Sequence, residues 1–264
     1  MAFFDYIQSD ANTPPELPLV HTTEYYRLAS IQADHTIGTD FQEPLVYLFY
    51  GRPAYRDCSR TTPAWKADDD DKDKSAMIGF YPICFVFSPG SILNNKPARA
   101  LYPFDTGAAH AGLYKPCIEP CHVDGYSLKP ATIENARRVV SCFFGTNENY
   151  LSSRPKADLH FSSGEGEASS YCKLINGGGH PDCDDRCSAI EVQVAEKLNL
   201  RNGVLTAVVL PSFFLDYPDL HHTILKVWRA QPLPYDGDLG LRPLEFHGAI
   251  RHLVRQFYRE SSLV

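Results

Sequence analysis

The sequence lacks the features of a membrane protein, of a secreted protein and of a protein that coats nucleic acid nonspecifically. No uninterrupted apolar run approaches the ~18 residues that a membrane helix needs. The first residues, MAFFD, lack the basic and apolar regions of a secretory signal. The formal net charge is −7, so the overall field repels phosphate, and a nucleic acid would need a local positive patch. We therefore expect a globular, cytoplasmic protein that does not associate with a membrane.

The motifs of three common enzyme classes are also missing. The 264 residues contain no Walker loop, no GxGxxG, no GxSxG and no internal repeat. These absences argue against a P-loop nucleotidase, a Rossmann dehydrogenase and an α/β-hydrolase. With 44% hydrophobic residues the chain can still bury a substantial core.

Eight cysteines occur without a secretory signal, which favours reduced thiols or a metal site over disulfides. One group offers four soft ligands for a structural zinc: Cys172, His180, Cys183 and Cys187. The two-residue cysteine spacing of zinc knuckles is missing. We therefore expect ordinary reduced cysteines and no metal, with zinc as the alternative.

Two long segments read as surface insertions, at about residues 57–76 and 92–130. The first contains the acidic run Asp68–Lys74, which lacks the glycine and the distal glutamate of a calcium-binding EF-hand loop. The second contains several prolines and glycines and predicts irregular structure. We expect both to lie outside the core.

Apolar patterns between these segments predict a mixed sheet with flanking helices. Short apolar or alternating runs predict strands at Leu17–Val20, Pro44–Tyr50, Ile83–Phe87, Ser188–Val194 and Val204–Leu210. Helical spacing predicts helices at Tyr25–Ile31, Ala131–Phe144 and Leu244–Tyr258. The last helix carries Arg251, Arg255 and Arg259, which form either a positive stripe or an ordinary solvated face.

Three residues at strand positions are candidates for a functional site. His21 lies where the first strand leads into a helix that Thr22 or Thr23 can cap, although a histidine there is commonly a structural residue. Arg52 follows the second strand, where its planar fork could hold a phosphate or carboxylate instead of a salt bridge. Glu191 alternates with apolar residues and so faces either a cleft or solvent.

The order of these elements resembles the ADP-ribosyltransferase superfamily. The stretches Val20–Thr23 (VHTT), Leu28–Ile31 (LASI) and Pro44–Pro53 (PLVYLFYGRP), followed by the late Glu191, are most similar to the DarT-type toxins that ADP-ribosylate nucleic acids. The resemblance implies an α+β fold in which a split mixed sheet holds NAD in a cleft between its halves. It implies one domain over residues 1–264, with the two insertions above.

The resemblance also implies which residues act. The residues implied to contact NAD are His21, Thr22, Thr23, Tyr47, Tyr50 and Arg52, with Tyr47 or Tyr50 stacking on nicotinamide. Glu191 would be catalytic, assisted by Arg52 and His21. Cleavage of the nicotinamide–ribose bond develops an oxocarbenium ion, which a carboxylate stabilises, and the same carboxylate can activate the acceptor as a general base.

The implied function is a toxin or defence effector that transfers ADP-ribose from NAD to DNA or RNA and releases nicotinamide. An antitoxin would be a possible partner. The alternatives are a protein ADP-ribosyltransferase or NAD hydrolase of the same fold, RNA 2′-phosphate transfer, for which only Arg52 and Arg56 are at hand, and a non-enzymatic zinc module. The interpretation has a geometric requirement: His21 and Glu191 should lie on adjacent strands and face one pocket.

Overall fold

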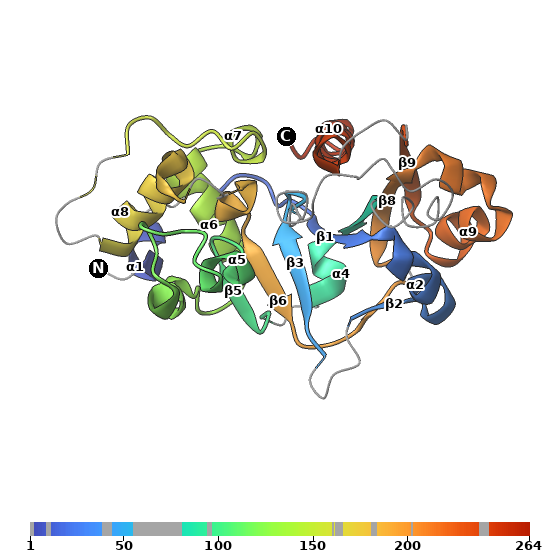
Figure 1. Cartoon of the computed structure of the whole chain (residues 1–264), viewed down its shortest axis with the longest axis horizontal. Coiled ribbons are helices and arrows are strands. Elements are labelled where there is room, and N and C mark those ends of the chain that lie inside the picture. The colour runs from blue at the N-terminus through green and yellow to red at the C-terminus, as the bar shows by residue number, and fades with distance from the viewer. Residues whose placement is uncertain are drawn as a thin grey trace, which may run out of the picture.

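A seven-stranded mixed sheet organises the protein (Figure 1). The computed structural model describes residues 3–8, 12–38, 44–54, 81–93, 97–159, 161, 166–180, 184–201, 203–237 and 243–264. The strand order is β5-β6-β3-β1-β4-β8-β9; β8 and β9 are parallel, and the other neighbours are antiparallel. The strands are β1 (Leu19–Glu24), β3 (Val46–Tyr50), β4 (Pro82–Phe87), β5 (Ala100–Tyr102), β6 (Glu191–Val194), β8 (Leu205–Pro211) and β9 (Gln231–Tyr235). A small second sheet pairs β2 (Thr36–Ile37) with β7 (Leu198–Asn199).

Helices flank this sheet, so the chain combines α and β structure as the sequence predicts. They are α1 (Phe3–Ile7), α2 (Leu28–Asp34), α4 (Pro89–Leu93), α5 (Thr106–His110), α6 (Ile133–Phe144), α7 (Asn147–Leu151), α8 (Gly166–Lys173), α9 (Pro218–His222) and α10 (Pro243–Glu260). Short 3₁₀ or π turns are η1 (Tyr25–Arg27), η3 (Pro120–Tyr126), η4 (Leu174–Gly178), η5 (Asp185–Ser188), η6 (Ser212–Asp216) and η7 (Thr223–Val227). In Figure 1, α1, α5, α6 and α8 gather beside β5 and β6, whereas α2 and α9 lie at the opposite end. Over the described ranges, no helix has both the length and the apolar character needed to cross a membrane.

The two central strands, β1 and β3, are paired over a short distance. Their register joins Leu19 to Tyr50 and Val20 to Phe49, whereas β1 pairs with β4 along its whole length, from Leu19 to Glu24. Beyond Val20 the two strands part. The side chain of His21 then takes the place of a ladder bond, because its Nδ1 lies 2.9 Å from the carbonyl oxygen of Tyr47.

The first strand is longer than the sequence predicts. β1 continues through His21 to Glu24, so neither Thr22 nor Thr23 caps a helix, and the helical turns begin at Tyr25. Thr22 and Thr23 are β-branched and favour an extended backbone. Pairing with β4 continues the strand through both of them. The following helix buries its expected apolar residues, Leu28 and Ile31.

The segment 92–130 is not an insertion outside the core. It supplies β5, which pairs with β6 as an outer strand, and α5, whose first residue contacts Glu191. Residues 151–179 contain several glycines and serines, which predict a loop, but the structure forms α8 there. Elements of three to eight residues give weak periodic signals, and tertiary pairing stabilises them rather than local propensity. The acidic run Asp68–Lys74 and Arg56 lie outside the described residues.

The other predicted elements are confirmed with small shifts of their ends. The runs Pro44–Tyr50, Ile83–Phe87 and Val204–Leu210 form β3, β4 and β8. α6 ends at Gly145, which has a positive φ of 80°. The strands β6 and β8 follow one another in the second half of the chain but lie on opposite sides of the sheet, separated by β3, β1 and β4.

The C-terminal helix α10 covers β4, β8 and β9 through Phe246, Ile250, Val254 and Tyr258, all buried. Its arginines do not form a free positive stripe. Arg255 and Arg259 both pair with Glu148 of α7, and Arg251 pairs with Asp185 in η5.

Candidate functional site

His21 lies in the gap where β1 and β3 part. A carbonyl oxygen can only accept a hydrogen bond, so Nδ1 of His21 must donate to Tyr47. Burial lowers the pKa of His21 below its ordinary value of 6.5, which outweighs the opposing effect of the bond to Tyr47. The imidazole is therefore neutral near pH 7, and its Nε2 keeps a lone pair that can accept a hydrogen bond from a ligand.

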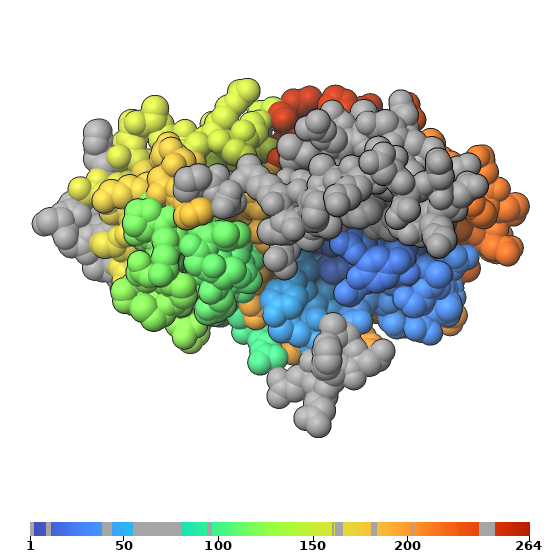
Figure 2. All heavy atoms as spheres, viewed as in Figure 1, coloured from blue at the N-terminus to red at the C-terminus, as the bar shows by residue number. Residues whose placement is uncertain are grey.

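A groove of about 420 Å³ opens beside this histidine. This volume falls in the range of small-molecule sites, roughly 300–1,000 Å³. The side chains that give the groove its chemistry are His21, Thr23, Tyr26, Arg27, Asp34 and Lys197, and Tyr47 also lines it, with its carbonyl oxygen on His21. They offer two cations, one carboxylate and the exposed aromatic ring of Tyr26. On the face in Figure 2, β3 (light blue) lies next to the segment that forms β1 and α2 (darker blue).

Glu191 is held in a separate, buried niche at the start of β6. Its side chain is 1% exposed. Oε1 accepts hydrogen bonds from Thr106 Oγ1 and Gln193 Nε2, both at 2.7 Å, and Oε2 accepts one from the Thr106 backbone N–H at 3.0 Å. Thr106 begins α5, where backbone N–H groups lack partners within the helix and favour a negative charge.

The environment of Glu191 brings its pKa into the physiological range. Burial raises the pKa to about 7, because hydrogen bonds from Gln193 and Thr106 only partly offset the loss of water, and the charge of Asp105 raises it further. A carboxyl group that changes protonation near neutral pH is suited to general base catalysis, or to stabilising a positive charge once ionised.

Asp105 and Arg186 support this niche from the side. Asp105 caps α5 by accepting a hydrogen bond from the N–H of Ala108 at 2.7 Å. Arg186 lies within 3.4 Å of Asp105 and donates to Asp184 at 2.9 Å. These contacts connect α5 to the turn before β6, and so fix Thr106 relative to Glu191.

Arg52 occupies a third position, at the end of β3. It is 1% exposed and donates from one terminal nitrogen to Ser188 Oγ at 2.6 Å. Its other terminal nitrogen lies 3.3 Å from Asp185 Oδ2 without the alignment of a hydrogen bond. Among the described residues, Nε has no hydrogen-bond partner. Within the described ranges, the guanidinium is therefore a buried cation with two nitrogens, Nε and one terminal nitrogen, that have no hydrogen-bond partner.

Two of the predicted NAD contacts need correction. Tyr50 is 0% exposed, and its hydroxyl accepts a hydrogen bond from the Leu17 N–H in the core, so it has no ring face on which a nicotinamide could stack. Thr22 projects from the sheet face opposite to His21 and Thr23, beside Cys84, and is not part of the groove wall. Tyr47 remains a candidate because it is 45% exposed.

His21 and Glu191 do not meet the predicted geometry. β3 lies between β1 and β6, so the two residues are not on adjacent strands. The register pairs Val20 with Phe49 and Phe49 with Glu191, which places Glu191 on the opposite sheet face from His21. The expectation of one shared pocket on adjacent strands is therefore wrong. The cause is β3, which enters the sheet between the two strands.

Tyr47 connects the two positions. Its carbonyl oxygen accepts the hydrogen bond from His21. Its ring projects from the sheet face that carries Glu191, because the register pairs Tyr47 with Gln193 and Phe49 with Glu191. Burial raises the pKa of its phenol, and the nearby charge of Glu191 raises it further. The groove, Glu191 and Arg52 thus lie around one strand, β3, with Tyr47 between the first two.

The cysteines give no metal centre in the part of the chain that the structure describes, where no three His, Cys, Asp or Glu side chains gather around one point. Cys172, His180 and Cys187 are therefore not assembled as a ligand set, and Cys183 lies outside the described residues. Cys172 instead contacts the Asn176 amide at 3.4 Å.

Sequence reasoning missed the residues that hold Glu191 and Arg52. Thr106, Asp185 and Ser188 were not among the predicted site residues. Asp105 followed by Thr106 is typical of a helix N-terminus, and this was the signal that the sequence offered. No local pattern, however, indicates that Thr106 contacts Glu191, which follows it by 85 positions. No protein-family model, curated protein or solved structure matches the chain.

Proposed function

We propose that the protein is an NAD-dependent ADP-ribosyltransferase in which the dinucleotide lies across β3. NAD consists of two nucleotides joined by a pyrophosphate, so one part can lie in the groove beside His21 while another passes through the gap where β1 and β3 part and reaches Glu191 on the opposite sheet face. This arrangement does not need His21 and Glu191 on adjacent strands. Tyr47, exposed on the sheet face that carries Glu191, offers a ring for stacking.

The reaction breaks the bond between nicotinamide and the ribose carbon C1′, and the electron pair leaves with nicotinamide. The ribose develops positive charge as this bond lengthens. Ionised Glu191 would stabilise that charge and bind a ribose hydroxyl. The acceptor then bonds to C1′ and loses a proton, which a carboxylate with a pKa of about 7 can take.

The observation that carries the proposal is Glu191 itself. A carboxylate that is 1% exposed and fixed by three donors is rigidly placed, and its pKa of about 7 lies far from that of an ordinary surface glutamate. Burial combined with a perturbed pKa is common at catalytic positions. Arg52 is a buried cation with two nitrogens that have no hydrogen-bond partner among the described residues, and it adds a group that can attract the pyrophosphate.

A nucleic acid is the acceptor that the groove favours. Arg27 and Lys197 supply positive charge in a chain of net charge −7. Tyr26 is 58% exposed, with the Arg27 guanidinium 5.6 Å from the ring centroid. Exposed aromatic rings with neighbouring cations are the features that bind single-stranded nucleic acids. The proposal includes an antitoxin partner that would keep the transferase from modifying the nucleic acids of its own cell.

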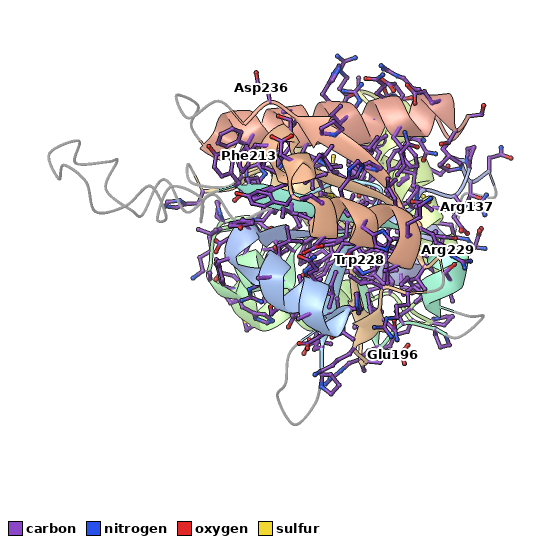
Figure 3. The ribbon with its side chains drawn as sticks, turned by 90° about the vertical axis from the view of Figure 1, so that its right-hand side faces the viewer. Arg137, Glu196, Phe213, Trp228, Arg229 and Asp236 are labelled. Carbon is purple, nitrogen blue, oxygen red and sulfur yellow. The ribbon has the colours of Figure 1, made fainter. Side chains whose placement is uncertain are left out.

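The test is incubation of purified protein with NAD labelled in the adenylate half, together with separate pools of DNA, RNA and protein. We expect label in a nucleic-acid pool, with release of nicotinamide. Glu191→Gln keeps the size of the side chain but cannot ionise, and should reduce transfer at least ~100-fold. The matched control is Glu196→Gln, because Glu196 is exposed and lies at the end of the molecule away from α10 (Figure 3).

Each outcome distinguishes between activities. Label in protein alone would indicate a protein ADP-ribosyltransferase, and free ADP-ribose without acceptor would indicate an NAD hydrolase. The proposal is refuted if the wild type neither binds nor consumes NAD with all pools supplied. It is also refuted if Glu191→Gln and Glu196→Gln have equal activity.

A further inference from the structure

Arg251 on α10 reaches the turn that holds Arg52. Both guanidinium groups contact the same atom, Asp185 Oδ2, although Arg251 follows Arg52 by 199 positions in the sequence. The Arg52 side chain is 1% exposed, whereas Arg251 and Asp185 are 32% and 31% exposed. One carboxylate therefore bridges a buried cation and a partly exposed one.

The turn that carries Asp185 is closed around Arg52. Ser188 accepts a hydrogen bond from Arg52 and donates to the backbone oxygen of Asp185 at 3.2 Å. This turn, η5, leads directly into β6 and Glu191. A shift of Asp185 would therefore reach both Arg52 and the start of β6.

The arginines of α10 have different partners. Arg255 and Arg259 pair with Glu148 of α7. Among the ion pairs of the described residues, Arg251 is the α10 arginine that contacts the Arg52 site. Arg255 lies one turn further along the same helix, and so provides a control of the same residue type.

The ion pairs of the described residues give this turn more positive than negative charge. Two guanidinium groups share one carboxylate, and Nε of Arg52 has no hydrogen-bond partner among the described residues. If Arg251 were absent, Asp185 could turn fully toward Arg52 and form an aligned pair. Arg251 therefore competes for Asp185, and leaves Arg52 with positive charge and donors that an anion can use.

We propose that Arg251 is a positioning residue for the candidate site: it holds Asp185 away from full pairing with Arg52, and so keeps Arg52 available for an anionic group of the substrate. The inference rests on the proposed function, in which that group is the pyrophosphate of NAD. Arg251 itself touches Asp185, and acts on Arg52 through it.

Titration with NAD at low ionic strength tests the effect on binding. Arg251→Ala should weaken NAD binding about two- to fivefold, since a partly exposed ion pair is weak, and Arg251→Lys should restore most of the affinity. Asp185→Asn removes the charge of the carboxylate for which the two arginines compete, and so should not weaken NAD binding as Arg251→Ala does. Arg255→Ala should have no effect. The differences should shrink as salt is added.

Urea unfolding tests the bridge without any ligand. A double-mutant cycle combines Arg251→Ala with Arg52→Lys, a milder change than truncation of a buried arginine. We expect the pair to be coupled, and the same cycle with Arg255→Ala to be additive. Equal coupling in both cycles would overturn the bridge even if the protein turns over NAD.

The two experiments separate two kinds of failure. A wild type that does not bind NAD refutes the proposed function, while the unfolding cycle still decides whether Arg251 acts on Arg52. A wild type that binds NAD, with Arg251→Ala and Arg255→Ala equal to it in affinity, refutes the inference and leaves the proposed function intact.

Discussion

Replacing Glu191 by glutamine should change how the stability of the protein depends on pH. Burial raises the pKa of Glu191 from 4.5 to about 7 in the folded state. Between these values the folded protein keeps a proton that the unfolded chain has lost, so the free energy of unfolding falls as pH rises. The difference in pKa corresponds to about 3 kcal/mol, present below pH 4.5 and lost by about pH 8.

Glutamine resembles the protonated acid and does not titrate. Its oxygen can accept from Thr106, and the Gln193 amide can reverse to accept from its NH₂ group. We therefore expect Glu191→Gln to gain stability relative to the wild type as pH rises, by about 2–3 kcal/mol between pH 5 and pH 8. The variant should be the more stable protein at the upper end.

Urea denaturation of the two proteins at constant ionic strength, in steps from about pH 5 to pH 8, measures this difference. Glu196→Gln is the control, because an exposed glutamate should give a curve parallel to that of the wild type. If the wild type and Glu191→Gln give parallel curves, the pKa of Glu191 is not raised by its niche, and the central argument for the site is lost.

Three further predictions use the same preparations. Gly51→Ala should destabilise the fold by more than about 2 kcal/mol, because φ is 66° and the new Cβ would lie 2.5 Å from Leu17 Cδ1; a loss below about 0.5 kcal/mol in urea denaturation would contradict the geometry. Tyr150→Phe should cost about 1–3 kcal/mol in the same assay, because the hydroxyl is the acceptor for the buried N–H of Ile190, and an unchanged midpoint would show that this bond is dispensable. If ionised Glu191 performs the transfer, kcat should rise with pH around an apparent pKa of about 7, and a rate that is flat between about pH 5.5 and pH 8.5 would refute that role.

The elements with strong local patterns could be predicted from the sequence. Pro44–Tyr50 is apolar and β-branched or aromatic, and it forms β3; Ala131–Phe144 has helical spacing and forms α6. The alternation in Ser188–Val194 correctly separates Glu191 and Gln193 from the apolar residues, because side chains of a strand alternate between its faces. These features depend on neighbours within one element.

Which segments bury the faces of a strand depends on residues far away in the chain. The alternation left Glu191 facing either a cleft or solvent, and the structure buries it because α5 brings Thr106 against it from 85 residues earlier. The resemblance implies that Tyr50 could stack on nicotinamide, whereas the structure places its ring in the core. The number of strands between His21 and Glu191 follows from the strand order, which no local pattern contains.

By itself, the sequence determined the chemical groups and their local backbone: a histidine in a strand, an arginine at a strand end and a glutamate in an alternating strand. The tertiary structure alone decided their environment. It placed β3 between His21 and Glu191, and it buried Glu191 away from water. It also brought Arg251 into contact with Asp185, which pairs with Arg52. The reason is physical: periodicity arises from contacts within a few residues, whereas desolvation and charge pairing arise from segments that meet only after folding.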